Sequence, residues 1–280
     1  MQPFGGASLT PLSSSSSLVL PLFPLKLFNP NPSSNLLSPH CVPIASSPST
    51  RPISATAPPA TTVLRKRKRY RKPCPGEAEG IVQEMRFVAM KLRNSQSSTD
   101  DGEGESWQPS LDGFLKYLVD SRLVFDTVER IVDESADVSY AYFRKTGLER
   151  SCGLSKDLEW FSQQGATIPE QSSPGISYAH YLEELTEKSA PAFLCHFYNL
   201  YFAHIAGGHL IGKQVCEKLA VGRELEFYRW QGDAQEMLKD AREKLNKLSE
   251  HWTRDEKNRC LREAAKSFKF LGQIVRLIIL

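Results

Sequence analysis

From Glu77 onward, apolar residues recur with the 3.6-residue period of an α-helix. Three stripes are the clearest: Leu111 to Val132, Met237 to Leu248, and Leu261 to Ile278. Charged residues fill the opposite faces, and Ser110 before the first stripe and the pair Thr253 and Glu256 before the third are typical helix starts. No segment alternates as a β-strand would. The pattern therefore predicts an all-α fold, a single-domain helical bundle around one core.

Residues 1–76 have a different character from the rest. They contain no Asp or Glu, are rich in Ser and Pro, and carry nine Lys or Arg, mostly within 65–72. Such a segment buries too little apolar surface to fold, and acid-free basic leaders are typical of organelle import. Because Ser and Pro interrupt every apolar run, a plastid transit peptide fits better than a secretory signal. We predict a disordered transit peptide over 1–64, a basic linker over 65–76 and a folded domain over 77–280, located in the chloroplast stroma.

The charge of the chain changes when this leader is set aside. The rest of the chain contains 26 basic and 32 acidic residues, which gives a net charge of −6. The run RKRKRYRK at 65–72 could indicate a nuclear signal or a nucleic-acid patch, but its place at the edge of the leader favours a solvated tail. We expect no basic face in the folded part to accompany it, and no nucleic-acid partner.

The six cysteines have neither a CxxC pair nor a metal-ligand spacing. Cys195 precedes His196, the order of a nucleophile beside its base. Consecutive residues of a helix point about 100° apart, so the two side chains cannot face each other. The sequence therefore predicts no metal site and reduced thiols in the folded part.

The segment from Ser189 to Gly212 contains no Asp, Glu, Lys or Arg. Its length would suffice to cross a bilayer. However, it holds three histidines, an asparagine and two tyrosines, which a lone span would leave unsatisfied in lipid. We therefore predict a buried central helix in a soluble bundle and no membrane span.

Within this segment the stretch YFAHIAGGHLIG carries Gly207 and Gly208 side by side. Each glycine costs a helix about 1 kcal/mol relative to alanine. Glycine is nevertheless favoured where another group must approach the helix backbone closely or where the helix bends. The approaching group is either a neighbouring helix or a flat ligand, with His204 or Tyr198 supplying polar contacts. Composition alone leaves both alternatives open.

The residues 197–213, FYNLYFAHIAGGHLIGK, resemble the distal-helix motif of the heme oxygenase family. EMRFVAMKL at 84–92 resembles the first helix of the plant members, and LEWFSQQG, SYAHYLEEL, LEFYRW and REKLN resemble further stretches in the same order. The resemblance covers Pro75 to Leu280. It implies a helical bundle in which a bent, glycine-bearing helix lies across one face of heme. It also implies a plastid enzyme that takes electrons from ferredoxin and makes biliverdin for the phytochrome chromophore.

One position departs from the family pattern. Active members hold the heme iron with a histidine that follows the stretch matching FVAMKL, and here that residue is Arg93. A guanidinium stays protonated and offers no lone pair, so it cannot ligate iron. His204 matches the distal position; ligation from that side would block the site where dioxygen binds. His209 is expected to face elsewhere.

The resemblance also assigns residues to the propionate end of a porphyrin. Arg86 and Tyr198 match family residues that meet the propionates, and Arg229 looks like another partner. Arg86 and Arg93 lie about 10 Å apart along one helix face. The predicted porphyrin-binding residues are therefore Arg86, Arg93, Tyr198, His204, Gly207, Gly208 and Arg229, with no catalytic residue and no metal ligand.

These features predict an inactive heme oxygenase homologue of the plant type-two branch. It would retain a tetrapyrrole pocket, require no cofactor and hold protoporphyrin or weakly bound heme, acting in tetrapyrrole metabolism, phytochrome chromophore supply and photomorphogenesis. One alternative is a weakly active, ferredoxin-dependent enzyme that converts heme to biliverdin, CO and iron. Another is a non-catalytic partner of an active heme oxygenase or another tetrapyrrole enzyme, contacting it through the acidic segment 99–105.

Overall fold

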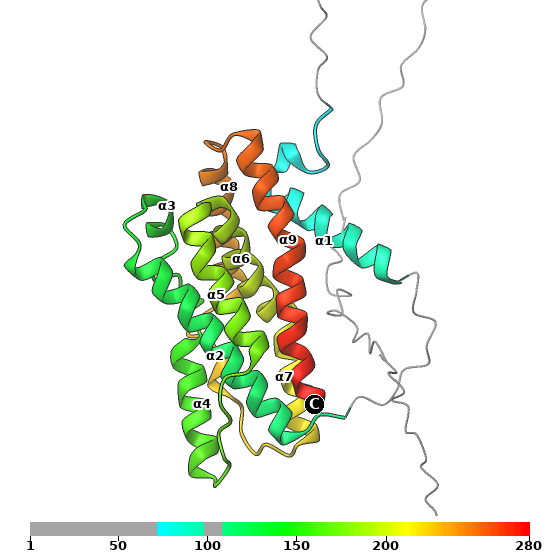
Figure 1. Ribbon diagram of the computed structural model, residues 1–280, viewed down its shortest axis with the longest axis vertical. Coiled ribbons are helices and arrows are strands. Elements are labelled where there is room, and N and C mark those ends of the chain that lie inside the picture. The colour runs from blue at the N-terminus through cyan, green and yellow to red at the C-terminus, as the bar shows by residue number, and fades with distance from the viewer. Residues whose placement is uncertain (1–71, 98–107) are drawn as a thin grey trace, which may run out of the picture. The chain divides into compact units, whose positions relative to one another are not determined.

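Helix α6 (Ala190–Ala203) lies at the centre of the structure, a computed structural model that describes residues 72–97 and 108–280. Every residue from Pro191 to Tyr201 is buried, as the absence of charge predicts. The hydroxyl of Ser189 caps the helix by accepting a hydrogen bond from the amide of Ala192. The helices packed against α6 include α5 (Ser173–Lys188), α8 (Ala234–Ser249) and α9 (Arg254–Val275) (Figure 1).

A second long helix, α2 (Leu111–Glu134), packs against α5, against α4 (Ser151–Gln163) and against the C-terminal turn η5 (Arg276–Ile279). The hydroxyl of Ser110 caps it, 2.9 Å from the amide of Gly113. A Cβ atom at Gly113 would lie 2.4 Å from the carbonyl oxygen of Leu277. Glycine therefore allows α2 to approach the end of the chain this closely.

Helix α1 (Ile81–Ser97) packs on α8 and α9. The amide of Val82 donates to Asn246 Oδ1 at 3.1 Å, and Arg254 forms an ion pair with Glu84 at 2.7 Å. The shorter elements are η2 (Glu77–Glu79), α3 (Val138–Ala141), η3 (His204–Gly208), α7 (His209–Lys218) and η4 (Glu226–Tyr228).

The all-α prediction is confirmed: the described residues contain helices, turns and loops and no β-strand, and those from Cys74 onward form one compact unit. The capping box of Thr253 and Glu256 is present at the start of α9. Leu111 departs from its predicted stripe, since it is 44% exposed. Within 72–97 and 108–280, no helix is both long and apolar enough to cross a membrane. The predicted transit peptide 1–64, the basic run up to residue 71 and the acidic segment 99–105 lie outside the described residues.

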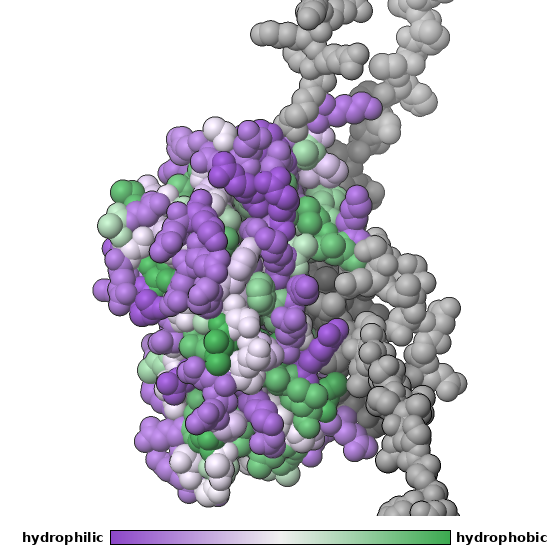
Figure 2. Space-filling view, in the orientation of Figure 1, coloured by the Kyte–Doolittle hydropathy of each residue, from purple (hydrophilic) through white to green (hydrophobic). Residues whose placement is uncertain are grey.

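The surface of α9 is strongly hydrophilic, as the purple residues along it in Figure 2 show. Five of its exposed side chains, counting the residue that follows its last turn, are cations on one face: Arg259, Arg262, Lys266, Lys269 and Arg276. The expectation that the folded part has no basic face is therefore wrong. The net negative charge of this part conceals a local row of positive charge.

Candidate functional site

The central helix changes its winding at the glycine pair. Helices α6 and α7 are continuous through η3, a π-helical turn in which the amide of His209 donates to the carbonyl of His204, five residues earlier. A π-turn of this kind inserts an extra residue into a helix and is frequent at functional sites. The sequence motif thus coincides with an irregular turn in the middle of a long helix. Gly207 and Gly208 are both buried within this turn.

Two of the glycines have an internal packing role. A Cβ atom at Gly208 would lie 2.8 Å from Nδ1 of His204. A Cβ atom at Gly212, one turn further on, would lie 2.1 Å from Cζ of Tyr228. At these two positions the missing side chain makes room for an aromatic ring of the protein itself.

The imidazole of His204 is held on the side of η4. Its Nε2 atom lies 2.9 Å from the carbonyl oxygen of Phe227, and its ring stacks on the Phe227 ring with centroids 4.1 Å apart. Burial lowers the pKa of His204 to about 3, so the ring is neutral and Nε2–H is the donor. Because Nδ1 faces Gly208, both ring nitrogens point at the protein's own backbone.

A buried carboxylate holds η4 in place. Asp157 of α4 is fully buried and accepts hydrogen bonds from the amides of Glu226 at 2.9 Å and Phe227 at 2.8 Å. Asp157 thereby fixes the position of Phe227, whose carbonyl oxygen accepts the hydrogen bond from His204. Sequence reasoning missed Asp157, although a signal was present: it lies three residues after Leu154, on the apolar face of α4.

A cationic cluster lies in the second half of α6, around Tyr198, one to two turns before η3. Burial raises the pKa of the Tyr198 hydroxyl to about 12, and the charges of Arg242 and Arg86 oppose part of that rise. The hydroxyl is therefore neutral and close to two guanidinium groups, both exposed. The charges of the predicted Arg86 of α1 and of Arg242 of α8 thus both act on Tyr198 of α6, and sequence reasoning missed Arg242.

Arg229 lies apart from this cluster, next to η4. Its guanidinium contacts Glu226 at 2.8 Å and Glu224 at 3.8 Å. Its carbonyl oxygen accepts a hydrogen bond from Arg150, whose guanidinium lies over the Trp230 ring. Through these contacts, Arg229 helps to pack the loop that follows η4.

Arg93 belongs to the last turns of α1, where the structure describes the backbone. On the same helix face, Arg86 is exposed, Ala89 is half-buried and Met90 is 45% exposed. This face of α1 therefore exposes the apolar side chain of Met90 and, one turn earlier, the cation Arg86. It carries no histidine.

A family model described as heme oxygenase matches residues 108–277. The chain belongs to the heme oxygenase family. Its sequence relatives include "Probable inactive heme oxygenase 2, chloroplastic" of Arabidopsis thaliana, 59% identical over 240 residues that cover 77% of this chain and 80% of the relative. The protein of that name in Oryza sativa subsp. japonica is 52% identical over 265 residues, with coverage of 80% and 79%. "Heme oxygenase 1, chloroplastic" of Arabidopsis is 45% identical over 287 residues, covering 98% and 99%.

Solved heme oxygenase structures share the fold. Heme oxygenase-1 from the cyanobacterium Synechocystis, in complex with heme, aligns with a TM-score of 0.58 at 16% identity, covering 70% of this chain and 91% of that one. Heme oxygenase 2 from Chlamydomonas reinhardtii, without heme, aligns with a TM-score of 0.57 at 17% identity, covering 71% and 97%. The predicted family and fold are confirmed, and the relatives' names confirm the predicted chloroplast location.

Within this heme oxygenase fold, none of the described histidines belongs to α1. His180 is exposed on α5 beside Glu184, and His209 and His251 are exposed on α7 and after α8. His204 is engaged with Phe227 as described above. None of these four imidazoles replaces the histidine that α1 lacks.

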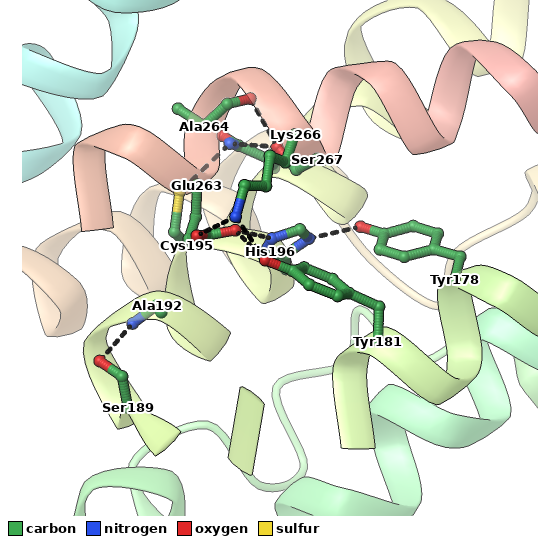
Figure 3. A network of polar contacts seen from close by, with 11 residues as sticks. Tyr178, Tyr181, Ser189, Ala192, Cys195, His196, Glu263, Ala264, Lys266 and Ser267 are labelled. Carbon is green, nitrogen blue, oxygen red and sulfur yellow. Dashed lines mark hydrogen bonds and ion pairs between the residues drawn. The ribbon is translucent and has the colours of Figure 1, made fainter. Parts of the chain in front are cut away.

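His196, the remaining described histidine, belongs to a buried network between α5, α6 and α9 (Figure 3). Its Nδ1 atom lies 3.0 Å from the Tyr178 hydroxyl and its Nε2 atom 3.2 Å from Glu263. Burial raises the pKa of Glu263, but hydrogen bonds from His196, Lys266 and Tyr181 outweigh burial and bring the pKa to about 2. Burial lowers the pKa of His196 itself. A neutral His196 therefore donates through Nε2 to an ionised Glu263, and no ring nitrogen is left for a metal.

The buried cysteines are also engaged within the core. Cys195 accepts a hydrogen bond from Asn199 at 3.5 Å, and Cys260 contacts the Met85 sulfur at 3.8 Å. Burial and the neighbouring Cys260 raise the pKa of the Cys195 thiol well above its usual value. Cys195 and His196 thus have separate partners, as the helical geometry predicted. The described residues thus provide two exposed guanidinium groups whose charges act on the neutral Tyr198 hydroxyl, and α1 carries no histidine that could ligate a heme iron.

Proposed function

We propose that this chain binds a tetrapyrrole between α1 and the α6–α7 helix and does not turn over heme. Two observations together support the proposal. The positive charges of Arg86 and Arg242 both act on the Tyr198 hydroxyl, and α1 contains no histidine. The first feature suits a dicarboxylate ligand, and the second removes the ligand that would hold iron.

The carboxylate part of the proposal rests on charge and donors. A guanidinium binds a carboxylate through two parallel hydrogen bonds, and a neutral phenol adds a third donor. Arg86, Tyr198 and Arg242 come from three different helices, so a porphyrin propionate pair would connect α1, α6 and α8. The apolar ring would then lie against Ala89 and Met90 on α1 and against Gly207 of η3.

The non-catalytic part rests on Arg93. When a histidine ligand is present, the heme iron supplies the oxygen activation on which this family's reaction depends. Arginine provides no lone pair for iron, so a metal-free porphyrin would lose nothing by its presence. The protein would then require no cofactor and would hold or sense protoporphyrin in the plastid, in the service of tetrapyrrole metabolism and phytochrome chromophore supply.

A titration of the full chain with hemin and with metal-free protoporphyrin tests this proposal. We expect the two affinities to agree within about tenfold, because iron adds no protein bond. A ferredoxin-coupled assay should yield no biliverdin. A sharp Soret band with stoichiometric biliverdin would instead establish the weakly active enzyme, and binding of neither compound would show that the pocket is lost.

A further inference from the structure

The exposed face of α9 carries a row of five cations that is interrupted once, by Gln273. The solvent-facing positions after Asp255, counting the first residue of η5, are Arg259, Arg262, Lys266, Lys269, Gln273 and Arg276, alternating in steps of three and four residues. That spacing keeps all six on one side of a helix. The row extends over about 25 Å, and Figure 2 shows hydrophilic residues along this helix.

Most of this charge is not neutralised by the protein. Lys266 pairs with Glu263 at 2.9 Å. Arg262, Lys269 and Arg276 form no ion pair with any carboxylate in the part of the chain that the structure describes. Like charges three and four residues apart repel one another, so an anion lying along the row would relieve that repulsion.

We propose that this row, Arg259 to Arg276, is a docking surface for an acidic segment of another protein. This inference goes beyond the tetrapyrrole proposal, because it concerns the outer face of α9 and not the cluster at Tyr198. A peptide or helix with carboxylates at intervals of one turn would place one anion opposite each cation. Charge complementarity of this kind favours encounter and fixes the register of two partners.

The surroundings favour a narrow protein partner over a lipid bilayer or a nucleic acid. Helix α5 packs beside α9 and presents Glu187 together with Glu183 and Glu184, which pair with Arg130 and Lys188. A broad anionic surface pressed on the row would also meet these carboxylates and the net charge of −6 that residues 77–280 carry. A single acidic segment aligned with α9 avoids both sources of repulsion.

The test uses the full chain with a photo-crosslinking amino acid in place of Gln273, between Lys269 and Arg276. The probe is a fluorescein-labelled oligoglutamate peptide about as long as the row. We expect a crosslink that weakens with added salt, because salt screens exposed charges. The same crosslinker at exposed Gln235 of α8 should give little product. Every variant retains the basic run 65–72, so binding there cannot explain a difference between them.

The decisive comparison is between two triple variants of equal charge. Arg262→Gln with Lys269→Gln and Arg276→Gln should lower the apparent affinity about tenfold, as three exposed ion pairs are lost. The control, Arg122→Gln with Lys156→Gln and Lys247→Gln, removes three exposed cations from α2, α4 and α8 and should change it less than about twofold. Equal losses in both variants would overturn the proposal. So would row-dependent binding of phosphatidylglycerol vesicles or a DNA duplex with no row-dependent binding of the peptide.

Discussion

The Nε2 atom of His204 donates a hydrogen bond to the carbonyl oxygen of Phe227, at 2.9 Å, and the two rings stack. This contact ties the middle of the α6–α7 helix to η4, which Asp157 holds from α4. His204 therefore acts as a structural link between these elements.

The stability of the fold should fall as the pH drops below 6.5, because of His204. Burial lowers the pKa of folded His204 to about 3, whereas the unfolded chain has a pKa of about 6.5. The unfolded state therefore binds more protons between these values. The stabilisation is complete above pH 6.5 and is lost as the pH falls towards 3. We expect a loss of about 2 kcal/mol between pH 7 and pH 5, measured by urea unfolding.

His204→Phe separates this effect from other titrations. The variant keeps an aromatic ring on Phe227 but leaves the carbonyl without its donor, at a cost of about 1–3 kcal/mol at pH 7. The pH dependence between 7 and 5 should become shallower. It should not vanish, because burial also lowers the pKa of His196. An unchanged slope in the variant would contradict the assignment.

Gly212→Ala should destabilise the protein by about 1–3 kcal/mol. The new methyl group would lie 2.1 Å from Cζ of buried Tyr228, a ring that cannot move into solvent. Gly222→Ala is the matched control, since a Cβ atom there has no neighbour within 4 Å. Thermal unfolding of both variants checks the prediction. A similar melting temperature for the two would mean that Tyr228 gives way easily.

The features that the sequence predicted correctly are local. The capping box joins residues three apart, Thr253 and Glu256, and the stripes of α2, α8 and α9 repeat within each helix. The contacts that were missed depend on packing: Phe227 lies 23 residues from His204, and Asp157 lies 70 residues from Phe227. The cation row of α9 was visible in the helical period but was hidden by averaging charge over the whole folded part.

Removing donors at Tyr198 should weaken binding mainly of porphyrins with free carboxylates. Tyr198→Phe and Arg242→Gln should each lower the affinity for protoporphyrin about five- to tenfold, as one charge-assisted or phenolic hydrogen bond is lost. Both should change the affinity for protoporphyrin dimethyl ester less than about twofold, because its neutral ester oxygens accept only weak hydrogen bonds. Arg229→Gln is the control, since Arg229 pairs with Glu226. Fluorescence titration gives all of these affinities, and equal losses for the acid and the ester would indicate general damage.

Arg93→His should restore a proximal iron ligand to α1. An imidazole has the lone pair that guanidinium lacks, so hemin should bind about tenfold or more tightly and show a sharp Soret band. Binding of metal-free protoporphyrin should not tighten, because no metal is present to ligate. Lys91→His is the matched control: it adds the same side chain to α1 two residues earlier, about 200° around the helix and away from the Arg86 face. Hemin titrations that compare the Soret bands of the two variants test this prediction. If Arg93→His behaves like Lys91→His, then the loss of heme chemistry extends beyond the missing ligand to the walls of the pocket.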